Sequence, residues 1–76
     1  MQKQSPGRAQ LERDVVDVVG PNSVHQANVW VAIGMLMEAH GLEERAALAY
    51  LRRRATERDL PLTELTALMV SRKEPA

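Results

Sequence analysis

The sequence predicts an all-α protein with one long helix, two shorter helices after it and a short helical extension before it. Three observations support this fold class. Ala, Leu, Arg and Glu, which all favour helices, dominate the second half of the chain. Apolar residues recur every three or four positions, which is the helical spacing. The 76 residues are too few for a second hydrophobic core, so a single domain is expected.

The charge balance and the absence of cysteine exclude several classes of protein. Lys plus Arg and Asp plus Glu both number 10, and this zero net charge argues against coating nucleic acid by bulk electrostatics alone. Without Cys there is no disulfide scaffold, no thiol catalysis and no Cys-based zinc site. The sequence has no apolar leader and no run of about 18 apolar residues, so we expect a cytoplasmic protein that does not enter a membrane.

The N-terminal part, residues 1–21, is expected to hold a tail and a short amphipathic helix. Residues 1–9 are polar and typical of a loose tail. Residues 10–19 carry apolar side chains at helical spacing, although their valine content is also compatible with a strand. Gly20 and Pro21 should end this element. Its apolar positions are Leu11, Val15, Val18 and Val19.

The long helix is expected to begin near Asn22 or Ser23 and to end at His40. Ser23 and Gln26 have the spacing of a capping box, in which two side chains satisfy free N–H groups of the first turn. Gly41 should follow as a left-handed C-cap, because glycine adopts a positive φ at little steric cost.

The composition of this helix predicts that it is covered on almost every side. Glu38 is its only formally charged side chain, and apolar residues lie on more than one face. A helix that is apolar nearly all round is normally buried nearly all round. We therefore expect the N-terminal valines or a second copy of the chain to cover what the main core stripe leaves open. The predicted dimer or partner face comprises Trp30, Ile33, Met37, Val15 and Val19.

Two shorter helices complete the predicted domain, which spans residues 22–72. The first should run over residues 43–58 and the second over residues 62–70, with residues 73–76 as a frayed tail. Pro61 separates the two helices, because proline is tolerated at the start of a helix and not in its interior. Their apolar positions are Ala47, Leu48, Leu51 and Ala55 in the first and Leu62, Leu65, Leu68 and Met69 in the second.

An ordered set of residues in this region resembles the ANTAR domain, the three-helix RNA-binding domain of bacterial transcription antiterminators. The similarity runs without gaps over about residues 25–70, which is most of the chain. The residues that carry it are Ala32-Ile33-Gly34-Met35-Leu36-Met37, His40-Gly41-Leu42, Ala47, Leu51-Arg52, Ala55, Pro61-Leu62 and Leu65.

The resemblance implies a function and a set of partners. Such domains bind RNA stem-loops in leader transcripts and thereby hold off a terminator hairpin. They usually follow a receiver, GAF or PAS domain that controls dimerisation. No such sensor domain precedes the motif in this sequence, so we expect a homodimer or a separate sensor protein as the additional partner. Neither a membrane nor a small-molecule substrate is implied.

Arginines in the helix predicted over residues 43–58 form the candidate RNA-contact surface. Five arginines lie between positions 45 and 58 against one acid, Glu57, whereas the first 41 residues hold three bases and four acids. With 3.6 residues per turn, Arg45 and Arg52 fall about 20° apart around the helix. This pair therefore suits a phosphate clamp, since Arg and Lys hold the phosphates of bound RNA.

Four further residues complete the predicted RNA-binding set. Tyr50 and Arg54, four positions apart, are a candidate pair for stacking on an unpaired base, and Arg53 should face solvent opposite the core. Gly34 lies mid-helix, where it costs roughly 1 kcal/mol relative to Ala, so we expect close helix packing or close approach of RNA there. The competing interpretation is that these arginines are solvated residues that complement the negative end of their helix.

No catalytic or metal-binding arrangement is evident. His25 and His40 are 15 positions apart, without Cys or clustered carboxylates near them in the sequence. Glu43 and Glu44 suit the positive start of a helix. There is no Gly-rich phosphate loop and no nucleophile–base pattern, so we expect neither an enzyme nor a protein with a metal or cofactor.

Two other functions are compatible with the sequence. Ile33 occupies a position that is often Lys in the ANTAR family, and Trp30 and Val31 replace residues that are often polar. These departures favour a protein-interaction or dimerisation module that derives from an ANTAR domain and has lost RNA binding. A DNA-binding helix-turn-helix that reads DNA through residues 62–70 is less favoured, because that helix has no basic residue before Arg72.

Overall fold

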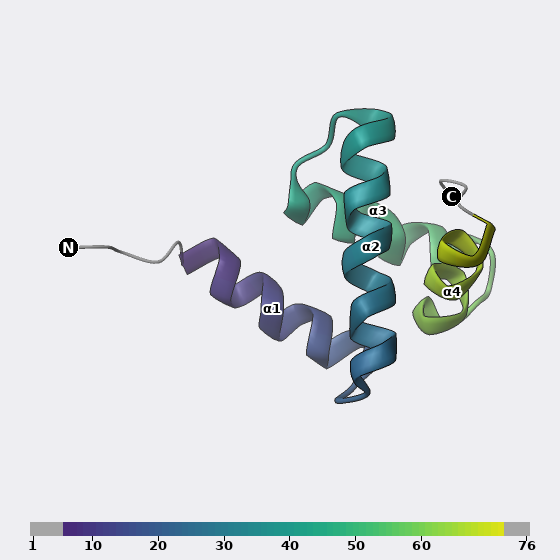
Figure 1. Ribbon diagram of the computed structural model, residues 1–76, viewed down its shortest axis with the longest axis horizontal. Helices are drawn as coiled ribbons and strands as arrows, with labels where there is room; N and C mark the ends of the chain where they lie inside the picture. Colours follow the sequence, from purple (N-terminus) through teal and green to yellow (C-terminus); the bar gives the residue numbers. More distant parts are fainter. Residues whose placement is uncertain (1–5, 73–76) are drawn as a thin grey trace.

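The computed structural model describes residues 6–72, which form four α-helices and no strand. They are α1 (Pro6–Val19), α2 (Ser23–His40), α3 (Glu44–Glu57) and α4 (Leu62–Arg72). Helix α2 is the longest, with α1 and α4 on either side of it and α3 behind it (Figure 1). The predicted all-α class is confirmed. The predicted tail at residues 73–76 lies outside the described residues, as do residues 1–5.

Helix α1 begins earlier than the sequence predicts. The expected loose tail at residues 1–9 is wrong for residues 6–9, which are helical. Pro6 is the first residue of the helix, a place where its missing N–H costs nothing. The strand alternative for residues 10–19 is also wrong, because helical spacing places one apolar side chain per turn against the core. These buried side chains are Leu11, Val15 and Val19.

The N-terminus of α2 is capped by Asn22 rather than by a Ser23–Gln26 capping box. The Oδ1 atom of Asn22 accepts hydrogen bonds from the backbone N–H groups of Val24 at 2.9 Å and His25 at 3.0 Å. Gln26 instead donates its Nε2–H to the carbonyl of Gly20 at 3.0 Å, which ties the first turn of α2 to the end of α1. An Asn side chain at the N-cap leaves the serine hydroxyl no role there.

The C-terminus of α2 ends as predicted. Gly41 has φ 67° and ψ 28°, in the left-handed region, and its N–H donates to the carbonyl of Met37 at 2.9 Å. This single residue turns the chain away from the axis of α2 and toward the start of α3 (Figure 1).

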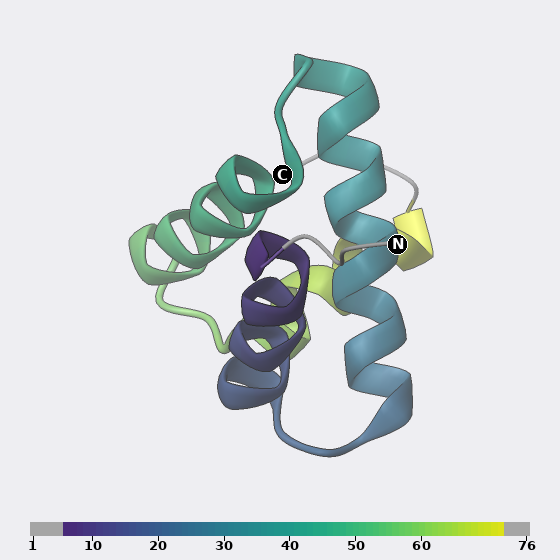
Figure 2. The ribbon, with the colours of Figure 1, turned by 90° about the vertical axis from the view of Figure 1, so that its left-hand side faces the viewer.

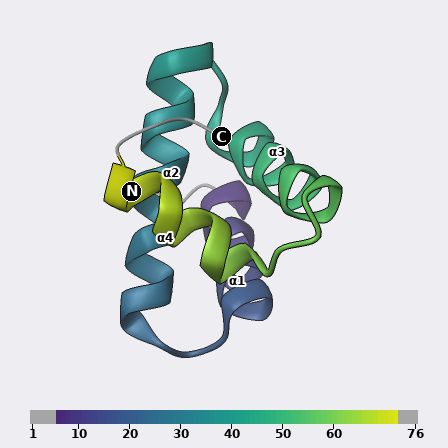
Figure 3. The same cartoon turned by 90° about the vertical axis from the view of Figure 1, so that its right-hand side faces the viewer.

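The hydrophobic core lies on one side of α2, and the other three helices surround it. Helix α4 crosses α2 on one flank (Figure 3), and α1 and α3 contact α2 from the other directions. Thr66 of α4 is fully buried, and its hydroxyl donates to the carbonyl of Leu62 at 3.0 Å, so this polar group has a partner inside the core. The core residues of α2 are Val29, Ala32, Ile33 and Leu36.

The structure corrects three of the five residues of the predicted partner face. Ile33 and Val15 are each 1% exposed and Val19 is 8% exposed, and all three belong to the same core cluster. They are buried in the core that the four helices of one chain form together, so no second copy is needed to cover them. Trp30 is half-buried and Met37 is exposed, so these two residues still reach the surface.

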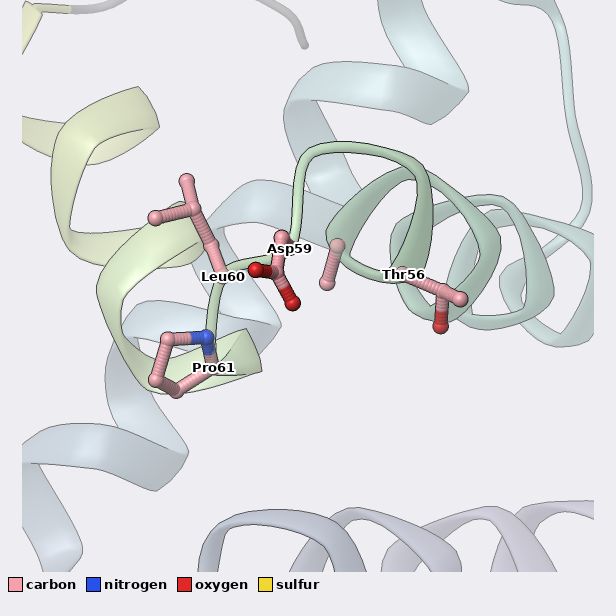
Figure 4. Close-up of a pocket in the computed structure, with 5 residues that line it drawn as sticks. Thr56, Asp59, Leu60 and Pro61 are labelled. Atoms are coloured by element: carbon pink, nitrogen blue, oxygen red, sulfur yellow. The ribbon is translucent and has the colours of Figure 1, made fainter.

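A tight turn links α3 to α4 and sets the direction of α4. The N–H of Leu60 donates to the carbonyl of Ala55 at 2.9 Å, and the N–H of Asp59 donates to that of Thr56 at 3.1 Å. These are the two bonds of a Schellman motif, with Asp59 at φ 57° in the position that glycine usually takes. Figure 4 shows Leu60 and Pro61 leading from this turn into α4, which continues to Arg72, two residues beyond its predicted end.

Two glycines of α2 and its cap provide a matched test of this backbone geometry. A Cβ atom would meet nothing within 4 Å at either Gly34 or Gly41, but only Gly41 has a positive φ. We therefore expect Gly41→Ala to lower the free energy of unfolding by about 1 kcal/mol. Gly34→Ala should raise it by up to about 1 kcal/mol, because Ala is the better helix former.

The two variants should be compared in dilute solution by urea denaturation followed by circular dichroism. Opposite signs are the expected result. A loss of stability in both variants would contradict the open space around Gly34.

Candidate nucleic-acid interface

The buried face of α3 fixes which of its side chains reach solvent. Ala47, Leu48, Leu51 and Ala55 are buried, and this orients the helix about its own axis. Arg45, Arg52 and Arg53 are therefore exposed, whereas Arg54 is half-buried. Ala46 and Ala49, also exposed, lie between these arginines in the sequence. Small residues between long cations leave the helix backbone open to close approach by a bulky polyanion.

Arg45 is paired with an acidic side chain of α1. Its Nη1 atom lies 3.6 Å from Oδ2 of Asp14, and the two side chains are 54% and 28% exposed. The other oxygen of Asp14 accepts a hydrogen bond from Nε2 of Gln10 at 3.0 Å, which holds the carboxylate in place. Figure 2 shows how α1 lies beside α3 at this point. An ion pair this exposed contributes only about 0–1 kcal/mol, so a phosphate can replace the carboxylate at little cost.

Tyr50 belongs to a small cluster that differs from the predicted one. Its ring stacks with the ring of His40 at a centroid distance of 5.6 Å and an interplanar angle of 30°. The guanidinium carbon of Arg53 lies 5.8 Å from the centre of the Tyr50 ring, within cation–π range. The predicted partner, Arg54, instead directs Nη1 toward Oε1 of Glu57 at 3.5 Å. The cluster of Tyr50, His40 and Arg53 therefore joins the end of α2 to the middle of α3.

Sequence reasoning missed the role of His40. It assigned His40 only to the end of its helix, because His40 and Tyr50 lie ten positions apart in the chain. The left-handed turn at Gly41 returns the chain along α2 and brings Tyr50 next to His40. A glycine cap followed by a short link was the available signal that the two residues would meet.

A shallow polar hollow lies next to this cluster. It has a volume of about 190 Å³ and is lined by Tyr50, Arg53, Arg54 and Glu57. The Nε atom of Arg54 is buried and has no hydrogen-bond partner among the described residues. A hollow of this size and polarity suits a phosphate group or the edge of a base better than an enclosed small molecule.

Gly34 does not belong to the arginine surface. It is exposed on α2, and the core that α2 shares with α3 lies on the opposite side of that helix. No Lys or Arg occurs in α2, so the surface around Gly34 offers no charge for phosphate. The structure therefore separates Gly34 from the other predicted RNA-binding residues.

A second hollow, larger than the one beside Tyr50, is a poor anion site. It has a volume of about 510 Å³ and lies at the link between α3 and α4 (Figure 4). Its lining includes the carboxylate of Asp59 and the hydroxyl of Thr56 but no basic side chain. Within residues 6–72, no three His, Asp or Glu residues are grouped as metal ligands would be, and no helix has the length and apolarity needed to cross a membrane.

Comparison with known protein families agrees with this architecture. Residues 25–70 match the ANTAR domain, and this region contains nearly all of α2, all of α3 and most of α4. Comparison with curated proteins and with solved structures gives no match. ANTAR domains are RNA-binding modules of transcription antitermination regulators. Because the match covers more than half of the chain, the chain belongs to the ANTAR domain family.

Proposed function

We propose that this protein binds stem-loop RNA in leader transcripts through the exposed face of α3 and thereby acts in transcription antitermination. The observation that supports this proposal most strongly is the segregation of charge. Arg45, Arg52 and Arg53 are all exposed on a single helix, while the net charge of the chain is zero. Family membership supplies the class of ligand, and the arginines supply the surface.

This face offers both kinds of contact that RNA loops require. Arg45 and Arg52 lie about two turns apart along α3 and about 20° apart around it, so they can hold phosphates of one strand. Tyr50 and Arg53 present an aromatic ring and a guanidinium plane, on which an unpaired base can stack. Contacts between arginines and the RNA phosphates set the affinity. Stacking on an unpaired base makes binding depend on the RNA loop.

Antitermination follows from competition between two RNA structures. A leader transcript that folds either into the bound stem-loop or into a terminator hairpin shifts toward the form that the protein binds. At a free protein concentration of about 100 times the Kd, this shift is worth about 2.7 kcal/mol. That is enough to favour one of two RNA folds of similar stability by roughly a hundredfold.

The first test is binding of the full chain to an RNA with two stem-loops that carry hexanucleotide loops. Binding should be measured at about 50 and 200 mM salt, with a scrambled-loop RNA as the control. We expect binding that needs the loop sequence and weakens with salt. Absent binding, or binding that ignores the loop sequence, would contradict the proposal.

The arginine pair predicts a change in salt dependence. The double variant Arg45→Ala/Arg52→Ala should weaken RNA binding and reduce the slope of log K against log salt by about two counterions. The matched control is Arg13→Ala/Arg72→Ala, which removes the same charge from exposed positions outside α3. An equal effect of both double variants would show that only net charge matters and that α3 is not the contact surface.

The ion pair between α1 and α3 predicts a variant that binds more tightly. Asp14→Asn removes the carboxylate that occupies Arg45, so the affinity for the same RNA should rise by about twofold to fivefold at low salt. Asp17→Asn is the control, because it makes the same charge change at an exposed position of α1. If both variants bind equally, Arg45 is not a phosphate contact.

The aromatic cluster predicts a requirement for a ring at position 50. Tyr50→Phe keeps the stacking surface and should bind RNA nearly as well as the original chain. Tyr50→Leu keeps an apolar side chain without a π face and should lose about 1–3 kcal/mol of binding free energy. The comparison is made by fluorescence anisotropy with the cognate RNA, and similar affinities for both variants would exclude stacking at this site.

One observation favours a second candidate function. The ANTAR position that is often Lys is Ile33 here, and Ile33 is buried in the same core cluster as Val15 of α1. A protein-interaction module that has lost RNA binding would not need an exposed Lys at this position, so a buried Ile33 is compatible with it. Loss of RNA binding in the stem-loop assay, together with a folded chain, is the result that would favour it.

A further inference from the structure

The ring of His40 is the part of the aromatic cluster that the proposed RNA contacts leave without a role. It stacks on the ring of Tyr50 with a centroid distance of 5.6 Å, which is typical of aromatic pairs. His40 is exposed, whereas Tyr50 is half-buried. The histidine is therefore the outer ring of this pair, and a ligand that approaches from solvent meets it first.

The end of α2 presents His40 on an open part of the molecule. His40 is the last residue of that helix. In Figure 1 and Figure 3, the last turn of α2 stands clear of α1 and α4, and the link to α3 leads away from it. The titratable and charged side chains around His40 thus come from α2, from this link and from α3. They are Glu38, Glu43, Glu44, Tyr50 and Arg53.

Histidine can serve RNA binding in two ways, depending on its charge. Its ring is one of the flat surfaces on which unpaired RNA bases stack. Its side chain is the one that ordinarily gains a proton between about pH 8 and pH 5. In the protonated form both ring nitrogens are donors, and the positive charge of the ring attracts phosphate. An exposed histidine beside an arginine can therefore make an RNA contact whose strength depends on pH.

We propose that His40 contacts the bound RNA and that protonation of its ring strengthens binding. This inference rests on the proposed RNA-binding function. An unpaired base adds to the stack of His40 on Tyr50, and the protonated ring adds a second cation to the one that Arg53 places 5.8 Å from the centre of the Tyr50 ring. Phosphates of the bound RNA lie near both cations and offset the repulsion between them.

The direction of the pH dependence follows from the charges. RNA is a polyanion and the protonated ring is a cation, so RNA binds the protonated form of His40 more tightly than the neutral form. Binding must then favour protonation in return, because the coupling between two ligands is reciprocal. The complex should consequently take up protons as it forms, and the affinity should rise as the pH falls through the range in which histidine titrates.

The test measures the affinity of the full chain for the stem-loop RNA at about pH 5.5 and about pH 7.5, at constant ionic strength. The original chain should bind about twofold to fivefold more tightly at the lower pH, as expected for one exposed charge contact. His40→Gln is neutral at both values and should bind equally at both. His40→Arg is always charged, so at the higher pH it should bind about as tightly as the original chain does at the lower pH.

The matched control is His25→Gln, which makes the same change in the other histidine of the chain. His25 lies in the first turn of α2, about 22 Å along the helix from His40. This variant should keep the pH dependence of the original chain. Equal circular dichroism spectra of all variants at both pH values should accompany this result. A pH dependence that persists in His40→Gln, or that disappears in His25→Gln, would overturn the role of His40.

Proton uptake provides a second readout that a purely structural role of His40 would not change. Calorimetric titrations in two buffers with different enthalpies of ionisation should show that the original chain takes up a fraction of a proton on binding RNA, and that His40→Gln takes up none. Binding that is equal at both pH values overturns this inference and leaves the proposed function standing. Absence of RNA binding at both values overturns the proposed function and the role of His40 together.

Discussion

Burial of one face of α2 is the constraint on which the rest of this structure depends. Val29, Ala32, Ile33 and Leu36 are each at most 1% exposed, and every other described helix contacts α2. Each larger aliphatic side chain buried in this way contributes about 1.5–3 kcal/mol, whereas the exposed ion pair between Asp14 and Arg45 contributes at most about 1 kcal/mol. Apolar packing therefore holds α1 in place, and the ion pair can be exchanged without detaching it.

The same burial divides the remaining surface into two unlike faces. With one side of α2 and one side of α3 turned into a shared core, their outer sides point away from each other. The outer side of α3 carries arginines and the cluster around Tyr50, and the outer side of α2 carries valines and small residues. The two faces therefore present unlike chemistry, cationic and aromatic on α3 and apolar on α2.

The fold could be predicted from the sequence to a large extent, because the spacing of apolar residues and the residues that end helices are local properties of the sequence. The apolar spacing identified all four helices, and Gly41 marked the end of α2. The N-cap was assigned wrongly because two neighbouring residues, Asn22 and Ser23, are both good caps and only the backbone angles decide between them.

The candidate site was predicted less completely, because its contacts join residues from different helices. Spacing along α3 identified which arginines face solvent, but it could not place His40 against Tyr50 or Asp14 against Arg45. It also placed Val15 and Val19 on a partner face, because the path of α1 across α2 depends on the turn at Gly20.

That turn has a mechanical consequence. Gly20 adopts φ 81° and the chain reverses there, so α1 runs back along the molecule instead of extending α2 as one continuous rod (Figure 2). A displacement of α1 is therefore passed first to α2 and α4, against which α1 packs, and only through the exposed pair of Asp14 and Arg45 to α3.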